Sequence, residues 1–335
     1  MKRFTLKLCS AATTLVLALC AGCVHAAGFQ HGIAADPDGK PLQIGIWYPS
    51  HATPQPLTIG PTTMRVAVNG TARGKTLPLV VMSHGTGGSF LGHFGTAIAL
   101  ADAGFVVVAV THTGDNHADQ SRSMDVMDRP RQISRVIDHM LSTWYGHATI
   151  DPARIGMFGF SAGGFTTLVS IGGIPDLPTV GPMCRQYPAD YACQLIARSS
   201  RYIALPLTTP TARTSDPRIK AAVVAAPALG FTFQSHLSWN VKVPVQLCRT
   251  DSDVILPHPR YAEAVRLALP EAPEYHVVPN AGHFDFLVPC SSALASVAPA
   301  ICTSAVGFDR AAFHASFDAA VLGFFKKTLE AGSSI

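Results

Sequence analysis

The most informative part of this sequence is Arg154-Ile155-Gly156-Met157-Phe158-Gly159-Phe160-Ser161-Ala162-Gly163-Gly164. It places Ser161 at the centre of Gly-x-Ser-x-Gly, directly after a short apolar run and directly before a helix-compatible run over 165–171. Where a strand turns this sharply into a helix, the serine backbone is strained and its hydroxyl projects out of the fold. Glycine is expected at 159 and 163 because a Cβ there would collide with the neighbouring strand or helix. The pattern therefore predicts a nucleophile elbow with Ser161 as the nucleophile.

Apolar runs alternate with helix-length segments along the chain, which is typical of βα units on a mostly parallel sheet. The runs are apolar on both faces, so helices should cover both faces of the sheet. We predict a single α/β domain over 27–335 with this architecture. The predicted strands are 42–47, 79–83, 105–110, 155–160, 221–225, 245–248 and 275–278, and the predicted helices are 94–103, 131–144, 162–171, 259–269 and 310–329.

Residues 172–217 interrupt this alternation. The segment is rich in proline, shows little periodicity and is too long for an ordinary connection. We predict a lid-like insertion that covers the site. A passive surface excursion held by a disulfide is the alternative.

Ser161 needs a base, a residue that orients the base, and donors for an oxyanion. In this kind of site the residues follow one another along the chain as Ser, acid, His. His283 follows the last predicted strand at a turn from which its side chain can reach back over the sheet edge. Asp253 lies in the loop after the preceding strand, at the usual distance before the next helix. Asp251 is nearer the strand end and stays open as the acid, or as a turn-forming residue.

Two backbone N–H groups should hold the oxyanion. One belongs to Ala162, directly after the nucleophile. The other is expected from the loop Ser83-His84-Gly85-Thr86-Gly87-Gly88-Ser89, where Thr86 is the best donor and Gly85 and Gly87 let the backbone approach the substrate. The loop lacks the lysine and the spacing of a nucleotide-binding loop.

Two further residues are candidates for the substrate pocket. His112 follows the third predicted strand at the carboxyl edge of the sheet, where substrates bind. A polar turn that holds its own loop is the alternative for this segment. Phe231 is expected to supply an apolar wall, with core packing as the alternative.

The first 26 residues resemble an export signal: a basic start, an apolar stretch over 8–20 and a small-residue cleavage site that ends at Ala26. The apolar stretch is too short to span a bilayer comfortably. Residues 19–23 also resemble a lipoprotein box with Cys23 as the lipidated residue, although Cys20 stands where leucine is usual. We predict a secreted or periplasmic protein without a membrane span, and a lipid anchor at Cys23 stays open.

Cysteine usage agrees with export. Cys184 and Cys193 lie nine residues apart, Cys290 and Cys302 lie twelve apart, and both pairs fall in loop-like segments. We predict two local disulfides and a buried free thiol at Cys248. The spacing of a zinc site is missing, so no metal or other cofactor is expected.

Charge excludes several classes of partner. The chain has 25 Lys and Arg against 21 Asp and Glu, and without residues 1–26 the balance is 22 against 21. No basic cluster predicts binding to nucleic acid or to an anionic membrane surface. A hydrophobic content of 48% with 14% charged residues predicts a large buried core. The sequence does not predict an oligomeric state.

The chain resembles the α/β-hydrolase superfamily, and within it the exported bacterial proteins labelled predicted dienelactone hydrolases, which are similar to platelet-activating-factor acetylhydrolases. The resemblance covers nearly all of 27–335. It is carried by Ile44-Gly45-Ile46-Trp47-Tyr48-Pro49, 83–89, Thr111-His112-Thr113-Gly114-Asp115-Asn116, 159–164 and Ala281-Gly282-His283-Phe284. It implies a serine hydrolase of small carboxylic esters, with short acyl groups, the triad Ser161, Asp253 and His283, and no cofactor.

One departure limits what the resemblance implies. True dienelactone hydrolases use a cysteine nucleophile and work in the cytosol, whereas this chain has a serine behind a predicted export signal. Hydrolysis of amides, peptides or polyesters by the same triad is an alternative. A catalytically silent relative used for binding is another, against which the three intact triad candidates argue.

Overall fold

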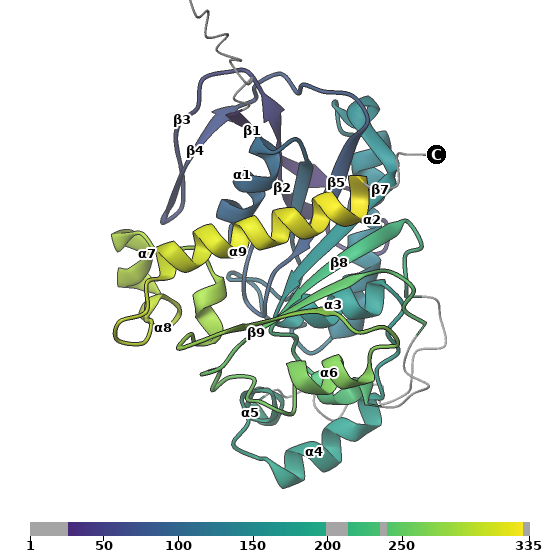
Figure 1. Cartoon of the computed structure of the whole chain (residues 1–335), viewed down its shortest axis with the longest axis vertical. Helices are drawn as coiled ribbons and strands as arrows, with labels where there is room; N and C mark the ends of the chain where they lie inside the picture. The colour runs from purple at the N-terminus through teal and green to yellow at the C-terminus, as the bar shows by residue number, and fades with distance from the viewer. Residues whose placement is uncertain (1–25, 199–213, 235–239, 331–335) are drawn as a thin grey trace, which may run out of the picture.

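One ten-stranded sheet organises the molecule (Figure 1). The structure is a computed structural model that describes residues 26–198, 214–234 and 240–330, so most of the predicted export signal, including Cys23, lies outside it. The sheet order is β10-β9-β8-β7-β5-β6-β2-β1-β4-β3. The strands are β1 (Ala26–Ala34), β2 (Leu42–Ser50), β3 (Gln55–Ile59), β4 (Thr62–Val68), β5 (Leu77–Ser83), β6 (Val106–Thr111), β7 (Ile150–Phe160), β8 (Ile219–Ala225), β9 (Val245–Thr250) and β10 (Glu274–Val278).

Six strands that are consecutive in the sheet run parallel to one another: β10, β9, β8, β7, β5 and β6. The strand β2 is antiparallel to both β6 and β1, and β3 is antiparallel to β4. All seven predicted strands are present, with ends that differ by a few residues. The strands β1, β3 and β4 were not predicted from the sequence. Because all six central strands are parallel, their carboxyl ends meet at one edge of the sheet, where the loops of the candidate site gather.

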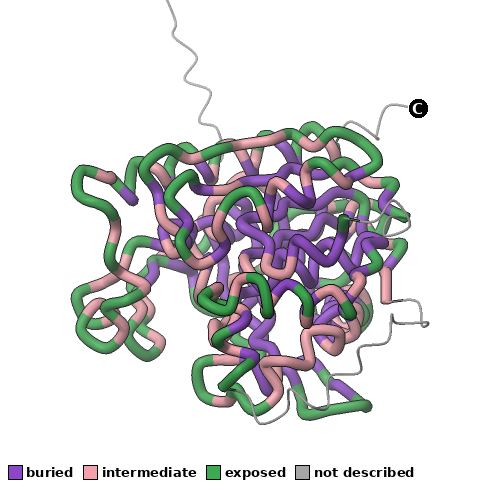
Figure 2. Tube along the Cα trace, turned by 90° about the horizontal axis from the view of Figure 1, so that it is seen from below, coloured by how far each residue is buried: buried purple, intermediate pink, exposed green. Residues whose placement is uncertain are grey.

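Helices cover both faces of the sheet, as predicted. The helices α1 (Phe94–Asp102) and α9 (Arg310–Phe325) pack on one face, and α2 (Arg129–Ser142), α3 (Ala162–Ser170) and α6 (Ala262–Ala268) pack on the other. Helix α2 shows why these helices pack on the sheet. Its buried residues recur at the spacing of one helix face, which makes that face apolar: Ile133, Val136, Ile137 and Met140. The buried chain forms a continuous interior in Figure 2.

The described part of the predicted insertion contains α4 (Val180–Gln186) and α5 (Tyr191–Arg198). These helices lie at the end of the molecule opposite β3 and β4 (Figure 1). Their buried side chains join a small apolar cluster that is separate from the two main cores; it contains Val180, Met183, Ile196, Phe231, Leu256 and Tyr261. Both predicted disulfides are formed, Cys184–Cys193 between α4 and α5 and Cys290–Cys302 around α7 (Ser292–Val297) and α8 (Pro299–Cys302), and Cys248 is a buried free thiol.

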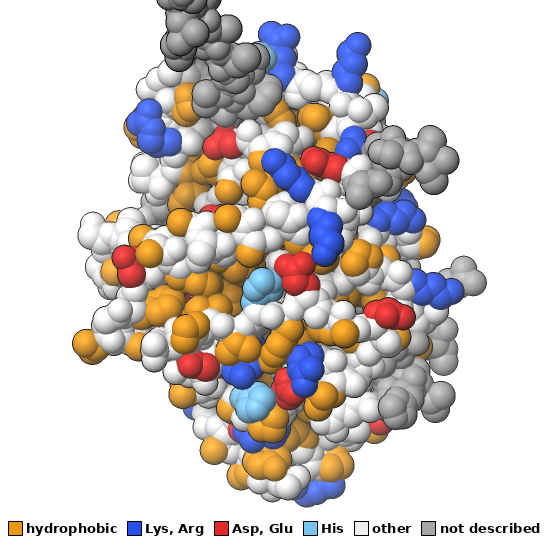
Figure 3. All heavy atoms as spheres, in the orientation of Figure 1, with side chains coloured by type: hydrophobic (Ala, Val, Ile, Leu, Met, Phe, Trp, Pro, Cys, Tyr) orange, Lys and Arg blue, Asp and Glu red, His pale blue; other side chains and the backbone are white. Residues whose placement is uncertain are grey.

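The surface agrees with the nearly balanced charge. Over the described part of the face in Figure 3, Lys and Arg side chains are scattered and form no continuous basic patch. Within residues 26–198, 214–234 and 240–330, no helix has the length and hydropathy needed to cross a membrane.

Candidate active site

Ser161 lies at the turn between β7 and α3. Its φ of 57° is positive, which is strained for a residue with a Cβ. Two hydrogen bonds fix the turn: the Ser161 N–H donates to the carbonyl of Ala225, and the Ser161 carbonyl accepts from the N–H of Ala228, each at 2.9 Å. A Cβ on Gly159 would collide with the first turn of α3, and one on Gly163 would collide with the end of β5. The local sequence therefore forces the serine hydroxyl out at the edge of the sheet.

The imidazole of His283 lies between Ser161 and Asp253. Its Nε2 is 3.1 Å from the Ser161 Oγ, and its Nδ1 is 2.7 Å from the Asp253 Oδ2. A carboxylate only accepts, so Nδ1 donates to Asp253 and leaves Nε2 to accept the serine proton. The His283 ring is buried and packs on the ring of Phe160 at 4.8 Å between centroids. The arrangement can deprotonate a serine hydroxyl.

The carboxylate at this site belongs to Asp253 and not to Asp251. The Asp253 Oδ1 accepts the backbone N–H groups of Ile255 at 2.9 Å and Leu256 at 2.7 Å, which fixes its orientation. Asp251 is exposed and accepts a hydrogen bond from the Ser252 hydroxyl at 2.9 Å. Of the two candidates, only Asp253 contacts the imidazole.

The loop after β5 lies beside the serine. Thr86 and Ala162 both line the pocket next to Ser161. Among the described residues, neither backbone N–H donates to another protein group. Gly85 approaches so closely that a Cβ on it would meet the Ser161 Cβ at 3.2 Å, and Gly87 has a φ of 69°, which favours glycine. Two N–H groups beside one hydroxyl can hold a developing oxyanion.

The pocket beside Ser161 is a cavity of about 200 Å³ with mostly apolar walls. One wall is the segment 123–128, which precedes α2. Another wall comes from the insertion, through Leu177, Val180 and four residues of α5: Tyr191, Ala192, Leu195 and Ile196. Among the described lining residues, the charged side chains are Asp125 and Asp128, and none is Lys or Arg. The chemistry of the walls favours an uncharged group.

His112 does not line this pocket, which corrects the predicted substrate contact. Its ring is fully buried behind the loop after β5. The Nδ1 donates to the Gln132 Oε1 at 2.8 Å, and the Nε2 accepts from the Ser83 hydroxyl at 2.8 Å. Burial, with the charge of Arg129 next, lowers the pKa of His112 well below 6.5. His112 therefore fits the alternative prediction, a polar turn that holds its own loop.

Phe231 does not line the Ser161 pocket either. Its ring is buried and packs edge-on against Tyr261 at 5.6 Å between centroids. It faces a separate cavity behind α4 that Tyr187 and Arg260 also line. The packing alternative therefore holds, and Phe231 supports the pocket wall from behind.

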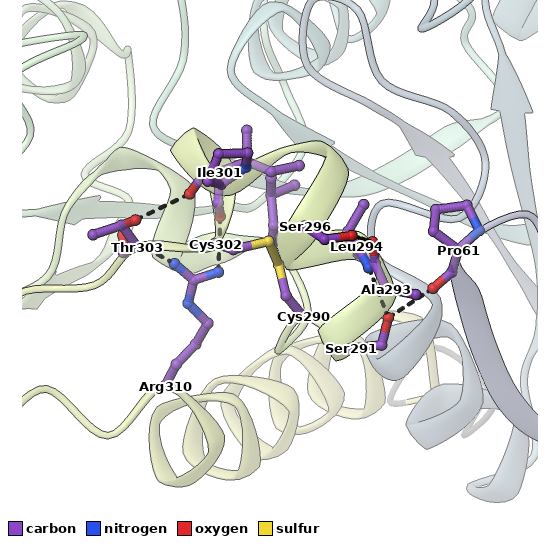
Figure 4. The surroundings of a disulfide bond; sticks show 12 residues. Pro61, Cys290, Ser291, Ala293, Leu294, Ser296, Ile301, Cys302, Thr303 and Arg310 are labelled. Carbon is purple, nitrogen blue, oxygen red and sulfur yellow. Dashed lines mark hydrogen bonds between the residues drawn. A yellow bond between two sulfur atoms is a disulfide. The ribbon is translucent and has the colours of Figure 1, made fainter.

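A buried ion pair stabilises the turn that carries His283. The Asp285 Oδ2 accepts the N–H of Gly282 at 2.7 Å, and the Asp285 Oδ1 lies 2.8 Å from the Arg310 Nη2. The Arg310 guanidinium also donates to the carbonyl of Ile301 at 2.9 Å, beside the Cys290–Cys302 disulfide (Figure 4). The C-terminal helix and the second disulfide therefore hold the loop of the imidazole.

A second buried ion pair lies beneath the loop of Thr86. Arg129 at the start of α2 pairs with Asp115, whose side chain bonds the N–H of Gly87. Asp115 lies in a segment for which a polar turn is one prediction, but the sequence does not predict Arg129 as its partner. One weak signal is the Arg-Pro pair just before the predicted helix 131–144, and the pairing itself depends on the fold.

Two comparisons with known proteins found similarities. The family model described as "Platelet-activating factor acetylhydrolase, isoform II" matches residues 55–140, a stretch that includes the loop of Thr86 but not Ser161. Among solved structures, the chain is similar to the "Ferulic acid esterase from Streptomyces cinnamoneus", at 19% identity and a TM-score of 0.64 over 94% of this chain and 93% of that chain. No curated protein matches the sequence. The structural likeness shows a shared fold.

Proposed function

We propose that this chain, an α/β-hydrolase, cleaves small, neutral carboxylic esters through an acyl-enzyme formed on Ser161. The observation that carries the proposal is the His283 ring, with one nitrogen 3.1 Å from a strained serine and the other 2.7 Å from Asp253. The matched family and the similar esterase support an ester as the substrate.

The first half of the reaction forms the acyl-enzyme. The His283 Nε2 takes the Ser161 proton while the Oγ attacks the ester carbonyl, and the Thr86 and Ala162 N–H groups bind the oxyanion. The protonated His283 then gives this proton to the departing alkoxide as the carbonyl–oxygen bond breaks. Asp253 keeps the proton on Nδ1 and stabilises the imidazolium.

The second half returns the enzyme to its starting state. His283 removes a proton from water, the hydroxide attacks the acyl carbonyl, and the same two N–H groups bind the second oxyanion. Collapse breaks the bond to the Ser161 Oγ, which recovers its proton from His283. The products are a carboxylic acid and an alcohol, and no external redox partner or metal takes part in these steps.

The pocket supports a small and uncharged acyl group. Its volume of about 200 Å³ is below the roughly 300–1,000 Å³ common for drug-sized ligands. Its apolar walls would have to desolvate any charge, and among the described lining residues there is no Lys or Arg that could pair with a carboxylate. Short alkanoyl esters fit these walls better than esters of dicarboxylic acids.

The insertion and the disulfides support two further parts of the proposal. The insertion covers the pocket as a lid-like wall, through Leu177, Val180 of α4, and Tyr191, Ala192, Leu195 and Ile196 of α5. We also propose that the protein works in the periplasm or outside the cell. Disulfides persist in oxidising compartments and are rare in the cytosol, and the described residues form two.

The test compares p-nitrophenyl acetate hydrolysis by the purified protein and its Ser161→Ala variant. The variant should lose roughly 10⁶-fold in kcat, because the triad acts as a unit. A p-nitrophenyl ester whose acyl group carries a carboxylate, assayed in parallel, should react much more slowly than the neutral ester of the same length.

Labelling gives an independent readout. A fluorophosphonate probe should label the wild-type protein and not Ser161→Ala. Turnover retained by Ser161→Ala would remove Ser161 from the mechanism. A wild-type protein that neither reacts with the probe nor cleaves any ester would support the binding alternative instead.

A further inference from the structure

The peptide group between Gly85 and Thr86 carries one of the two proposed oxyanion donors. The Gly85 carbonyl accepts hydrogen bonds from the His84 Nδ1 at 2.6 Å and from the N–H of Gly88 at 3.1 Å. In a planar trans peptide the carbonyl and the N–H point in opposite directions. Holding the Gly85 carbonyl inside the loop therefore directs the Thr86 N–H outward, towards the pocket that Thr86 lines.

The His84 ring can hold that carbonyl only with its proton on Nδ1. Its other nitrogen, Nε2, is then the acceptor for the backbone N–H of His112 at 3.0 Å. Burial, with the positive charge of Arg129 next, lowers the pKa of His84 well below 6.5. The ring is therefore neutral at physiological pH, with one nitrogen free to donate and one to accept.

A single buried ion pair contacts both sides of this peptide group. The Arg129 Nη1 donates to the His84 carbonyl at 2.7 Å, and its Nη2 donates to the Asp115 Oδ2 at 2.5 Å. The Asp115 Oδ1 accepts the N–H of Gly87 at 3.0 Å. The pair therefore binds the residue before Gly85 and the residue after Thr86.

On its other side, the His84 carbonyl is packed against α3. A Cβ on Gly163 at the start of α3 would meet the His84 carbonyl at 2.8 Å, so this carbonyl lies between α3 and the Arg129 guanidinium. The side chains of Asp115 and Arg129 are 4% and 3% exposed. A buried ion pair adds little net stability over apolar residues of the same volume, so stability alone does not explain this one.

Building on the proposed function, we propose that Asp115 and Arg129 are positioning residues that hold the Thr86 N–H in place for the oxyanion before the reaction begins. They touch neither the substrate nor the reacting atoms. Their effect acts through His84 and Gly87, the two residues that flank the donor peptide.

The test measures kcat and KM for p-nitrophenyl acetate in Asp115→Asn. The neutral amide removes the charge that pairs with Arg129, so the loop should lose its fixed position and kcat should fall roughly 10²-fold. KM should change by less than about threefold, because the apolar walls are untouched. The inhibition constant of a trifluoromethyl ketone, which forms an oxyanion on Ser161, should rise as kcat/KM falls.

Two further variants separate positioning from stability. Asp216→Asn breaks another pair with a buried aspartate, to Arg218, before β8 at the opposite edge of the sheet, and it should leave kcat unchanged. Asp115→Leu/Arg129→Met replaces both partners with apolar side chains and leaves no unpaired buried charge. This double variant should unfold near the wild-type temperature and still show the roughly 10²-fold loss in kcat. If Asp115→Asn does not fold, the double variant provides the test in its place.

The outcomes distinguish the two proposals. A double variant with wild-type kcat, or an Asp115→Asn protein whose loss matches only its unfolded fraction, would overturn the positioning role and leave the esterase proposal intact. Activity retained by Ser161→Ala would overturn the esterase proposal itself. A loss in kcat that leaves trifluoromethyl ketone binding unchanged would also count against positioning, because the oxyanion would then be held as before.

Discussion

The floor and the wall of the pocket are held together differently. The floor consists of the loops that carry Ser161, Thr86 and His283, and it rests on parallel strands and two buried Asp–Arg pairs whose side chains are 1–8% exposed. The wall consists of α4 and α5, which depend on one disulfide, a small apolar cluster and an ion pair between Asp190 and a quarter-exposed Arg260.

We therefore expect the floor to determine the rate of the reaction and the wall to determine which acyl groups bind. A rigid floor keeps donors and the base in place before the substrate arrives, which is what transition-state stabilisation requires. A wall with few attachments to the main core can change its shape without disturbing those groups. Substitutions in the floor should therefore lower kcat, whereas substitutions in the wall should change KM and the range of acyl groups.

Apart from the loss of Ser161 itself, the largest expected effect comes from the proposed acid of the floor, Asp253. Asp253→Asn should lower kcat roughly 10⁴-fold, because an asparagine amide can reverse the tautomer that His283 needs. The matched control is Asp251→Asn, two residues earlier in the same loop, which should stay within about threefold of wild type because Asp251 does not contact the ring. Steady-state kinetics with p-nitrophenyl acetate measures both. Equal losses in the two variants would contradict the assignment of the acid.

Most of the floor could be predicted from the sequence because short-range patterns encode it. Gly-x-Ser-x-Gly between an apolar run and a helix predicts the elbow, and the position of His283 after the last strand of a parallel sheet predicts its place beside Ser161. The Asp115–Arg129 pair could not be predicted, because its partners lie fourteen residues apart, one in a loop and the other at the start of a helix. Buried ionic partners depend on which loops the fold brings together.

The wall and the edge of the sheet were harder to predict for another reason. The helices α4 and α5 have seven and eight residues, too few to be stable without a disulfide and neighbours, and α4 contains a proline. The strand β1 contains glycines and polar residues, and β3 and β4 form a hairpin at the edge of the sheet with Gly60 at its turn. These strands are stabilised by pairing with the rest of the sheet, which composition does not reveal.

Removing each of the two disulfides in turn compares the wall with the floor, with an expected effect smaller than that of Asp253→Asn. Cys184→Ala/Cys193→Ala and Cys290→Ala/Cys302→Ala open loops of similar length, so each should lower the free energy of unfolding by about 2.5 kcal/mol. The first should raise KM for longer acyl esters and keep kcat for the acetate, because α4 and α5 only line the pocket. The second should lower kcat, because its loop contacts Arg310 and through it the turn of His283.

Denaturant unfolding and a series of p-nitrophenyl esters of increasing acyl length measure both parts of this prediction. If both variants changed the same kinetic parameter by the same factor, the wall and the floor would not have separate roles in selectivity and in rate.

The floor should also be sensitive to acid. His93 is buried beneath Phe160, and burial, with nearby His314 next, lowers the pKa of His93 to about 3. In the unfolded chain this histidine takes up a proton near pH 6.5, whereas in the folded chain it does not until the pH is far lower. Full stability is therefore present above pH 6.5 and is lost as the pH falls, by about 1.4 kcal/mol per pH unit for each such histidine.

Burial also lowers the pKa values of His84 and His112, so both add to the loss of stability in acid. His84 lies in the floor, and the rings of His112 and His93 contact it through Ser83 and Phe160. A His93→Phe variant keeps an aromatic ring against Phe158 and Phe160 but cannot bind a proton. Its free energy of unfolding should depend on pH less steeply than that of the wild type between pH 6.5 and 4.5, by about one proton. Unfolding curves across this range measure the difference. An unchanged slope would mean that His93 is protonated in the folded protein, and that acid does not weaken the floor through this ring.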